Sequence, residues 1–189
     1  MHKTQLASVA FGLSTAMILA VSTYTPADIA NLAGSTVQAP APDDATIIAI
    51  FDAANTADIE TGQLAAKRGH SQEVRDFGAM LARDHTAARK LGRDLAKKLG
   101  VTPTPPEGDE GAKKHAATMA MLSARKGPEF DHAFLQYEVA FHKGVIEAVQ
   151  STLLPAIDNP ELKKLVVEVA RAFQAHMLAA QALDDQLSK

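Results

Sequence analysis

Residues 71–100, SQEVRDFGAMLARDHTAARKLGRDLAKKLG, contain the clearest helical pattern in the chain. Apolar or small residues recur along it every three or four positions, at Val74, Phe77, Gly78, Leu81, Ala88, Leu91, Leu95 and Leu99. This spacing is that of the buried face of an α-helix. Ser71 is suited to cap the first turn of this helix and Gly100 to end it. His85 lies within the apolar stripe, so the pattern predicts a histidine that points into a core.

Three further long helices and one short helix are predicted from the same periodicity. They run from Asp43 or Asp44 to about Arg68, from Ala112 to about Ala124 (the short one), from Gly127-Pro128 to just before Pro155, and from Asn159-Pro160 to about Leu187. No alternating strand pattern of useful length is present, so the predicted fold class is all-α. The first two long helices are joined by a few residues and must be antiparallel neighbours, as must the last two, whereas a long connection separates the pairs. This predicts a ferritin-like four-helix bundle with one long crossover that contains the short helix.

The N-terminal part of the chain differs in composition from the helical part. Residues 1–27 begin with a short positive segment and continue with an apolar run. We predict that they are a secretory signal peptide cleaved after Ala27; the alternative is an N-terminal anchor that stays attached. Residues 28–43 are predicted to be a flexible tether, and residues 44–189 the bundle domain. The expected location is therefore the periplasm or cell envelope, with a membrane or another envelope protein as an expected neighbour.

Composition excludes several function classes. The chain has no cysteine, which rules out a disulfide framework, a thiolate nucleophile and metal sites built on cysteine. Its formal net charge at pH 7 is −3, with both signs mixed along the chain and no basic block. Nucleic acid is therefore not an expected partner.

Ligand-type side chains occupy the apolar stripe of all four long helices. The four residues are Asp58, His85, His142 and His176. His142, for example, is seven residues after Leu135, and His176 is seven after Val169, spacings that put both imidazoles on the buried face of their helices. The two residues of each hairpin also lie at similar heights along the bundle, counted from the turn of that hairpin. At 1.5 Å per residue, the heights differ by roughly 4.5 Å for Asp58 and His85 and by roughly 6 Å for His142 and His176. Inward ligands on four helices are what a metal site in a bundle core requires.

The predicted cofactor is one divalent transition-metal ion in a roughly tetrahedral shell of these four residues, with zinc, iron or copper left open. Glu138, one turn before His142, is a further candidate as a fifth ligand, as an acceptor for a ligand N–H, or as a proton carrier. The alternative for Glu138 is a half-exposed helix carboxylate. Asp84 is interpreted as a surface carboxylate or as one that orients an imidazole. A ferritin-type di-iron centre would need a glutamate three residues before two of the histidines, but Ala82 and Phe173 stand there, so one ion is favoured over two.

A second hypothesis involves no metal. The three histidines and Asp58 would then form a structural polar network in the core, in a non-catalytic envelope stress or interaction protein. An enzymatic version of the metal hypothesis would use an open coordination position. No substrate pocket is recognisable in the sequence, so no reaction is predicted.

Four stretches resemble a family of bacterial exported ferritin-like proteins of uncharacterised function, often labelled as outer-membrane or membrane proteins. They are residues 51–65 (FDAANTADIETGQLA), 77–85 (FGAMLARDH), 127–142 and 170–183, within a resemblance that covers about residues 44 to 187. That family usually has glutamate at the position of Asp58, and an amide or methionine at the position of Glu138. The resemblance implies a ferritin-like bundle and an envelope location, and it implies no reaction.

Overall fold

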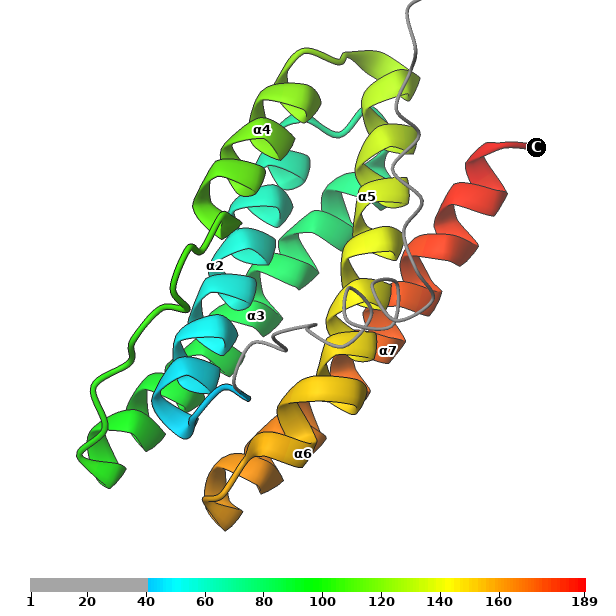
Figure 1. Cartoon of the computed structure of the whole chain (residues 1–189). Helices are drawn as coiled ribbons and strands as arrows, with labels where there is room; N and C mark the ends of the chain where they lie inside the picture. Colours follow the sequence, from blue (N-terminus) through cyan, green and yellow to red (C-terminus); the bar gives the residue numbers. More distant parts are fainter. Residues whose placement is uncertain (1–40) are drawn as a thin grey trace, which may run out of the picture. The chain divides into compact units, whose positions relative to one another are not determined.

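A computed structural model of the chain describes residues 41–189, and every regular element in this range is helical. The long helices are α2 (Asp44–Arg68), α3 (Gln72–Leu99), α5 (Gly127–Ala148) and α7 (Pro160–Leu187), with the short α4 (Gly111–Ser123) between α3 and α5. A π-helical segment, η1 (Val149–Leu153), and a short helix, α6 (Leu154–Ala156), continue α5 (Figure 1). The all-α prediction is confirmed. The predicted signal peptide and nearly all of the predicted tether lie outside the described residues.

The long helices form a bundle of two antiparallel hairpins. In the first hairpin α2 packs along α3, and in the second α5 packs along α7 (Figure 1). The hairpins touch where α3 meets α7 and where α2 meets α5, and α4 lies against α2 and α5. The connection lengths predict the pairing within each hairpin, and the contacts between hairpins come from the structure alone. Of the helices described, none combines the length and the apolar character that crossing a membrane requires.

The helix ends follow the capping residues in the sequence. Asp43, Ser71 and Asn159 each accept a hydrogen bond from a backbone N–H of the first helical turn. Gly100 ends α3 in the left-handed region, with φ of 67°. Pro155 departs from the prediction, because it lies inside the helical run rather than after its end. The π-helical turn before it resets the hydrogen-bond pattern, so the proline occupies the first turn of α6, where its missing N–H is tolerated.

Asp131 aligns the two hairpins. It is buried in the first turns of α5, and its two carboxylate oxygens accept hydrogen bonds from the backbone N–H groups of His70 and Ser71, at 2.7 and 2.8 Å. Both donors belong to the turn between α2 and α3. Hydrogen bonds to a charged acceptor are among the stronger ones in proteins. The beginning of α5 is therefore fixed beside this turn, and α5 runs parallel to α3.

Within the first hairpin, α2 and α3 come into backbone contact at two glycines. A Cβ atom on Gly78 would lie 2.7 Å from the carbonyl oxygen of Gly62, and a Cβ on Gly62 would lie equally close to the carbonyl oxygen of Gly78. Asp58 is one turn from Gly62, and His85 is two turns from Gly78, on the same helix faces. The close approach therefore brings these two polar side chains together.

We predict that Gly78→Ala lowers the free energy of unfolding by roughly 1–3 kcal/mol, because the new methyl group meets backbone that can move only if the helices separate. Gly144→Ala is the matched control, since a Cβ there meets nothing within 4 Å. That change is expected to stabilise the protein by up to about 1 kcal/mol through helix propensity. Urea unfolding of both variants measures the difference, and equal effects would contradict the close contact.

Two apolar clusters lie on either side of a layer of buried polar side chains. One cluster includes Val74, Leu81, Phe134 and Ala180, and the other includes Ile47, Ala96, Val149 and Val166. Along each long helix, the buried polar residues of this layer fall between the two clusters. The fold thus encloses a polar layer in the middle of an apolar core.

Candidate metal centre

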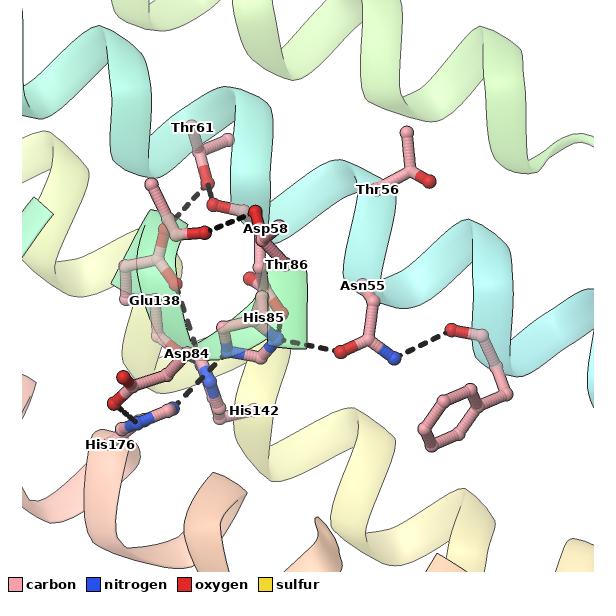
Figure 2. A network of polar contacts seen from close by, with 12 residues as sticks. Asn55, Thr56, Asp58, Thr61, Asp84, His85, Thr86, Glu138, His142 and His176 are labelled. Carbon is pink, nitrogen blue, oxygen red and sulfur yellow. Dashed lines mark hydrogen bonds and ion pairs between the residues drawn. The ribbon is translucent and has the colours of Figure 1, made fainter. Parts of the chain in front are cut away.

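Five ligand-type side chains meet in the polar layer (Figure 2). They are Asp58 from α2, His85 from α3, Glu138 and His142 from α5, and His176 from α7. All five are buried, and the most exposed of them, His176, shows 6% of its surface. They form two overlapping groups, in each of which one ligand atom per residue lies within 4.8 Å of the others. The first group contains the three histidines, and the second contains Asp58, Glu138 and His142.

Nδ1 of His85 is fixed as a hydrogen-bond donor. We call it the outer nitrogen of this ring, because the other nitrogen, Nε2, faces His176. The side-chain NH₂ group of Asn55 donates to the backbone carbonyl of Phe51 at 2.8 Å, a contact in which only the amide nitrogen fits. The amide oxygen of Asn55 therefore faces Nδ1 of His85, at 3.0 Å. Because that oxygen only accepts, Nδ1 must carry the proton. In neutral His85, Nε2 is consequently left with a lone pair.

The same reasoning applies to the other two histidines. Nδ1 of His142 lies 2.9 Å from the backbone carbonyl oxygen of Glu138, and Nε2 of His176 lies 3.3 Å from Oδ2 of Asp84. Both oxygens are acceptors, so these nitrogens also carry protons. The remaining nitrogens, Nε2 of His142 and Nδ1 of His176, hold lone pairs. Hydrogen bonds of this kind from the outer nitrogen are typical of histidines that bind metal.

The three nitrogens with lone pairs face one another. Nε2 of His85 is 3.2 Å from Nδ1 of His176, and Nε2 of His142 is buried without a hydrogen-bond partner. Two imidazole nitrogens on one tetrahedral ion, at about 2.0–2.1 Å from it, are roughly 3.3 Å apart. The observed separation therefore fits a shared cation. Without a cation or a proton between them, the lone pairs would repel.

Burial disfavours a proton at this position. Burial, aided by the neighbouring histidines, lowers the pKa of His85 to about 3, and burial lowers the pKa of His142 to about 4 against the opposing hydrogen bond to the carbonyl of Glu138. Burial also lowers the pKa of His176, although Asp84 opposes this. The imidazoles are therefore neutral near pH 7, which is the form that binds a metal ion.

Asp58 and Glu138 form a pair of buried carboxyl groups beside the histidines. Thr61 donates a hydrogen bond to Oε1 of Glu138 at 2.9 Å, while Oε2 of Glu138 and both oxygens of Asp58 have no hydrogen-bond partner. Oδ2 of Asp58 lies 3.3 Å from Nδ1 of His85, and Oε2 of Glu138 lies 3.4 Å from Nδ1 of His142. The structure thus places Asp58 with Glu138, at the outer side of the imidazoles, rather than within the three-histidine group.

Burial raises the pKa of both carboxyl groups, and the charge of Glu138 raises the pKa of Asp58 further. Two carboxyl groups this close and this dry do not both ionise readily without a cation. Unpartnered buried oxygens are rare in folded proteins and require an explanation. A proton held between Asp58 and Glu138, or a cation beside them, would supply the missing partner.

Several residues that support the site were not singled out from the sequence. Asn55 and Thr61 are fully buried on α2, spaced three residues to either side of Asp58. This polar row on an otherwise apolar helix face was the available signal. One of the two interpretations of Asp84 was that it orients an imidazole. In the structure Asp84 contacts the imidazole of His176, which lies on another helix.

The remaining histidines of the described chain lie away from the polar layer, as expected. His70 is exposed in the turn between α2 and α3. His115 is 2.7 Å from a carboxylate oxygen of Glu60, and His132 is 2.7 Å from one of Asp184. Neither belongs to a group of three ligand-type residues.

Comparison with protein families gives a match to a domain of unknown function, DUF4142, over residues 30–183. The matched range includes all five ligand-type residues and begins before α2, within the segment predicted to be a tether. Comparisons with curated proteins and with solved structures gave no match. Because the family match covers most of the chain, the protein belongs to the DUF4142 family.

Proposed function

We propose that this protein is an exported, ferritin-like bundle that binds one transition-metal ion through His85, His142 and His176, with Asp58 and Glu138 as an adjacent carboxyl pair that balances the charge of the ion. The observation that carries the proposal is the convergence of three imidazole lone pairs, each set by a hydrogen bond on the opposite ring nitrogen. Imidazole ligands suit zinc, iron and copper. The export of the chain rests on the composition of residues 1–27.

The residues of the chain have separate tasks in this proposal. The histidines bind the ion, and Asn55, Asp84 and the carbonyl of Glu138 hold their rings in place. The carboxyl pair balances the positive charge and gives up protons when the ion enters. A bound ion with three nitrogen ligands would supply a Lewis acid with room for a further ligand.

A structural polar network remains the second candidate, favoured by one contact. The 3.2 Å separation between His85 and His176 also suits a hydrogen bond if His176 carries a proton on both nitrogens. Asp84 would stabilise that cation. In this case the bundle would be an envelope stress or interaction protein without a metal.

Metal content separates the two candidates. We expect untagged protein, saturated with zinc, iron(II) or copper and then dialysed, to retain about one ion per chain, since the three-histidine group offers a single set of converging nitrogens. Mass-spectrometric elemental analysis measures this ratio. Retention of no metal would favour the polar network, and retention of two ions would contradict the single site.

A further inference from the structure

A small apolar cavity lies between α2, η1 and α7, next to the candidate metal centre. Its volume is about 30 Å³, and the residues around it include Phe51, Ala54, Asn55, Val149, Ala170 and Phe173. This is about two to three times the volume that one water needs. Asn55 is the polar residue of the lining, and its amide already donates to Phe51 and accepts from His85. A water in it would find too few polar partners, so an apolar occupant is favoured over water.

The cavity adjoins the metal centre through two shared residues. Asn55 holds the ring of His85, and the ring of Phe173 lies 4.9 Å from that of His85 and 5.5 Å from that of His142, between centroids. A molecule in the cavity is therefore one side chain, Phe173, away from the imidazoles.

A second hollow approaches the cavity from the surface. It has a volume of about 160 Å³ and lies between α7 and the end of α5 with η1. The exposed residues Gln150, Arg171 and Gln174 line its outer part. Val149 and Ala170 belong to the lining of both hollows, so the two hollows adjoin at these residues. Val149 begins the π-helical segment, whose wider turn is typical of helices near functional sites.

We propose that the inner cavity is a docking site for a small uncharged diatomic molecule, of the class of dioxygen and nitric oxide, on its way from the surface hollow to the metal centre. Its volume is far below the roughly 300 Å³ or more of ordinary organic ligand pockets. Its apolar lining disfavours ions and water. The role of the cavity as a route rests on the proposed metal centre, whereas the capacity of the cavity to hold such a molecule does not.

Xenon tests the cavity directly, because it binds in dry apolar cavities without any chemistry. Crystals of the wild type, Ala54→Val, Ala170→Val and Ala53→Val are exposed to xenon under pressure. Ala54 and Ala170 line the cavity, whereas the neighbouring Ala53 is exposed and provides the matched control. We expect xenon in the cavity of the wild type and of Ala53→Val, and its loss in both cavity variants. A wild type without xenon there, or cavity variants that retain it, would overturn the proposal.

Nitric oxide tests the route to the metal. Stopped-flow absorbance follows its association with the iron(II)-loaded protein. We expect association in Ala54→Val and Ala170→Val to be slower by about tenfold or more, because the molecule must displace packed side chains. Metal content is expected to be equal in all variants. Unchanged rates with xenon displaced would overturn the route. If no variant binds iron, the proposed function fails, and the xenon result still decides the cavity.

Discussion

Replacing His142 by alanine is expected to leave the protein without bound metal under conditions where the wild type retains an ion. His142 is the residue common to both ligand groups, and its inner nitrogen has no other partner. Loss of an outer hydrogen bond alone lowers metal affinity about 10- to 100-fold, so loss of a ligand should lower it by more than that. Elemental analysis after dialysis gives the metal content of both proteins.

Thermal melts with and without metal give a second measure of the same substitution. Metal present at about 1,000 times its Kd should stabilise the wild type by about 4 kcal/mol, and it should stabilise His142→Ala little. His70→Ala, at an exposed position, should behave as the wild type. In the polar-network alternative, His142→Ala loses roughly 1–3 kcal/mol whether metal is present or not. Equal metal-induced shifts in the wild type and in His142→Ala would therefore end the metal hypothesis.

The metal-free protein is expected to lose stability as the pH rises from about 7.5 to 8.5, and Glu138→Gln should flatten this dependence. Burial raises the pKa of Glu138 above its value in the unfolded chain, so the folded chain keeps a proton that the unfolded chain has released. The stability linked to that proton is complete below the carboxyl pKa of the unfolded chain and is lost as the pH rises through the folded pKa. The slope is up to about 1.4 kcal/mol per pH unit for each retained proton.

The histidines add little slope above about pH 7.5, because their lowered pKa leaves them neutral when folded, and in the unfolded chain their ordinary pKa of about 6.5 leaves them mostly neutral as well. Urea unfolding at several pH values, with chelator, measures the dependence. Glu147→Gln, on the exposed face of α5, is the control and should keep the wild-type slope. At pH 8 we expect Glu138→Gln to be more stable than the wild type without metal, yet to be stabilised less by metal. An unchanged slope in Glu138→Gln would show that this carboxyl group does not hold the proton.

The sequence predicts the direction of each ligand because an α-helix has a fixed period. His85, His142 and His176 point inward because each is in phase with apolar residues of its own helix. The helix ends can also be predicted from nearby residues, since Asp43, Ser71 and Asn159 cap the turns that follow them. Such features need information from only a few neighbouring residues.

The remaining features depend on contacts between distant segments. The alignment of the hairpins rests on Asp131 and on backbone N–H groups about 60 residues away, which no local pattern encodes. The grouping of Asp58 with Glu138 depends on how α2 faces α5 and on the hydrogen bond from Thr61. Pro155 misled the prediction because a π-helical turn cannot be recognised from apolar spacing alone.

The three histidines come from both hairpins, since His85 lies on α3 whereas His142 and His176 lie on α5 and α7. An ion bound to all three would connect the hairpins and would be surrounded by side chains that are almost fully buried. We expect the exit of such an ion to require a local opening of the bundle between the hairpins. The rate at which bound metal exchanges with a labelled isotope in solution would therefore report how often the hairpins separate, a local opening that is otherwise followed by amide hydrogen exchange.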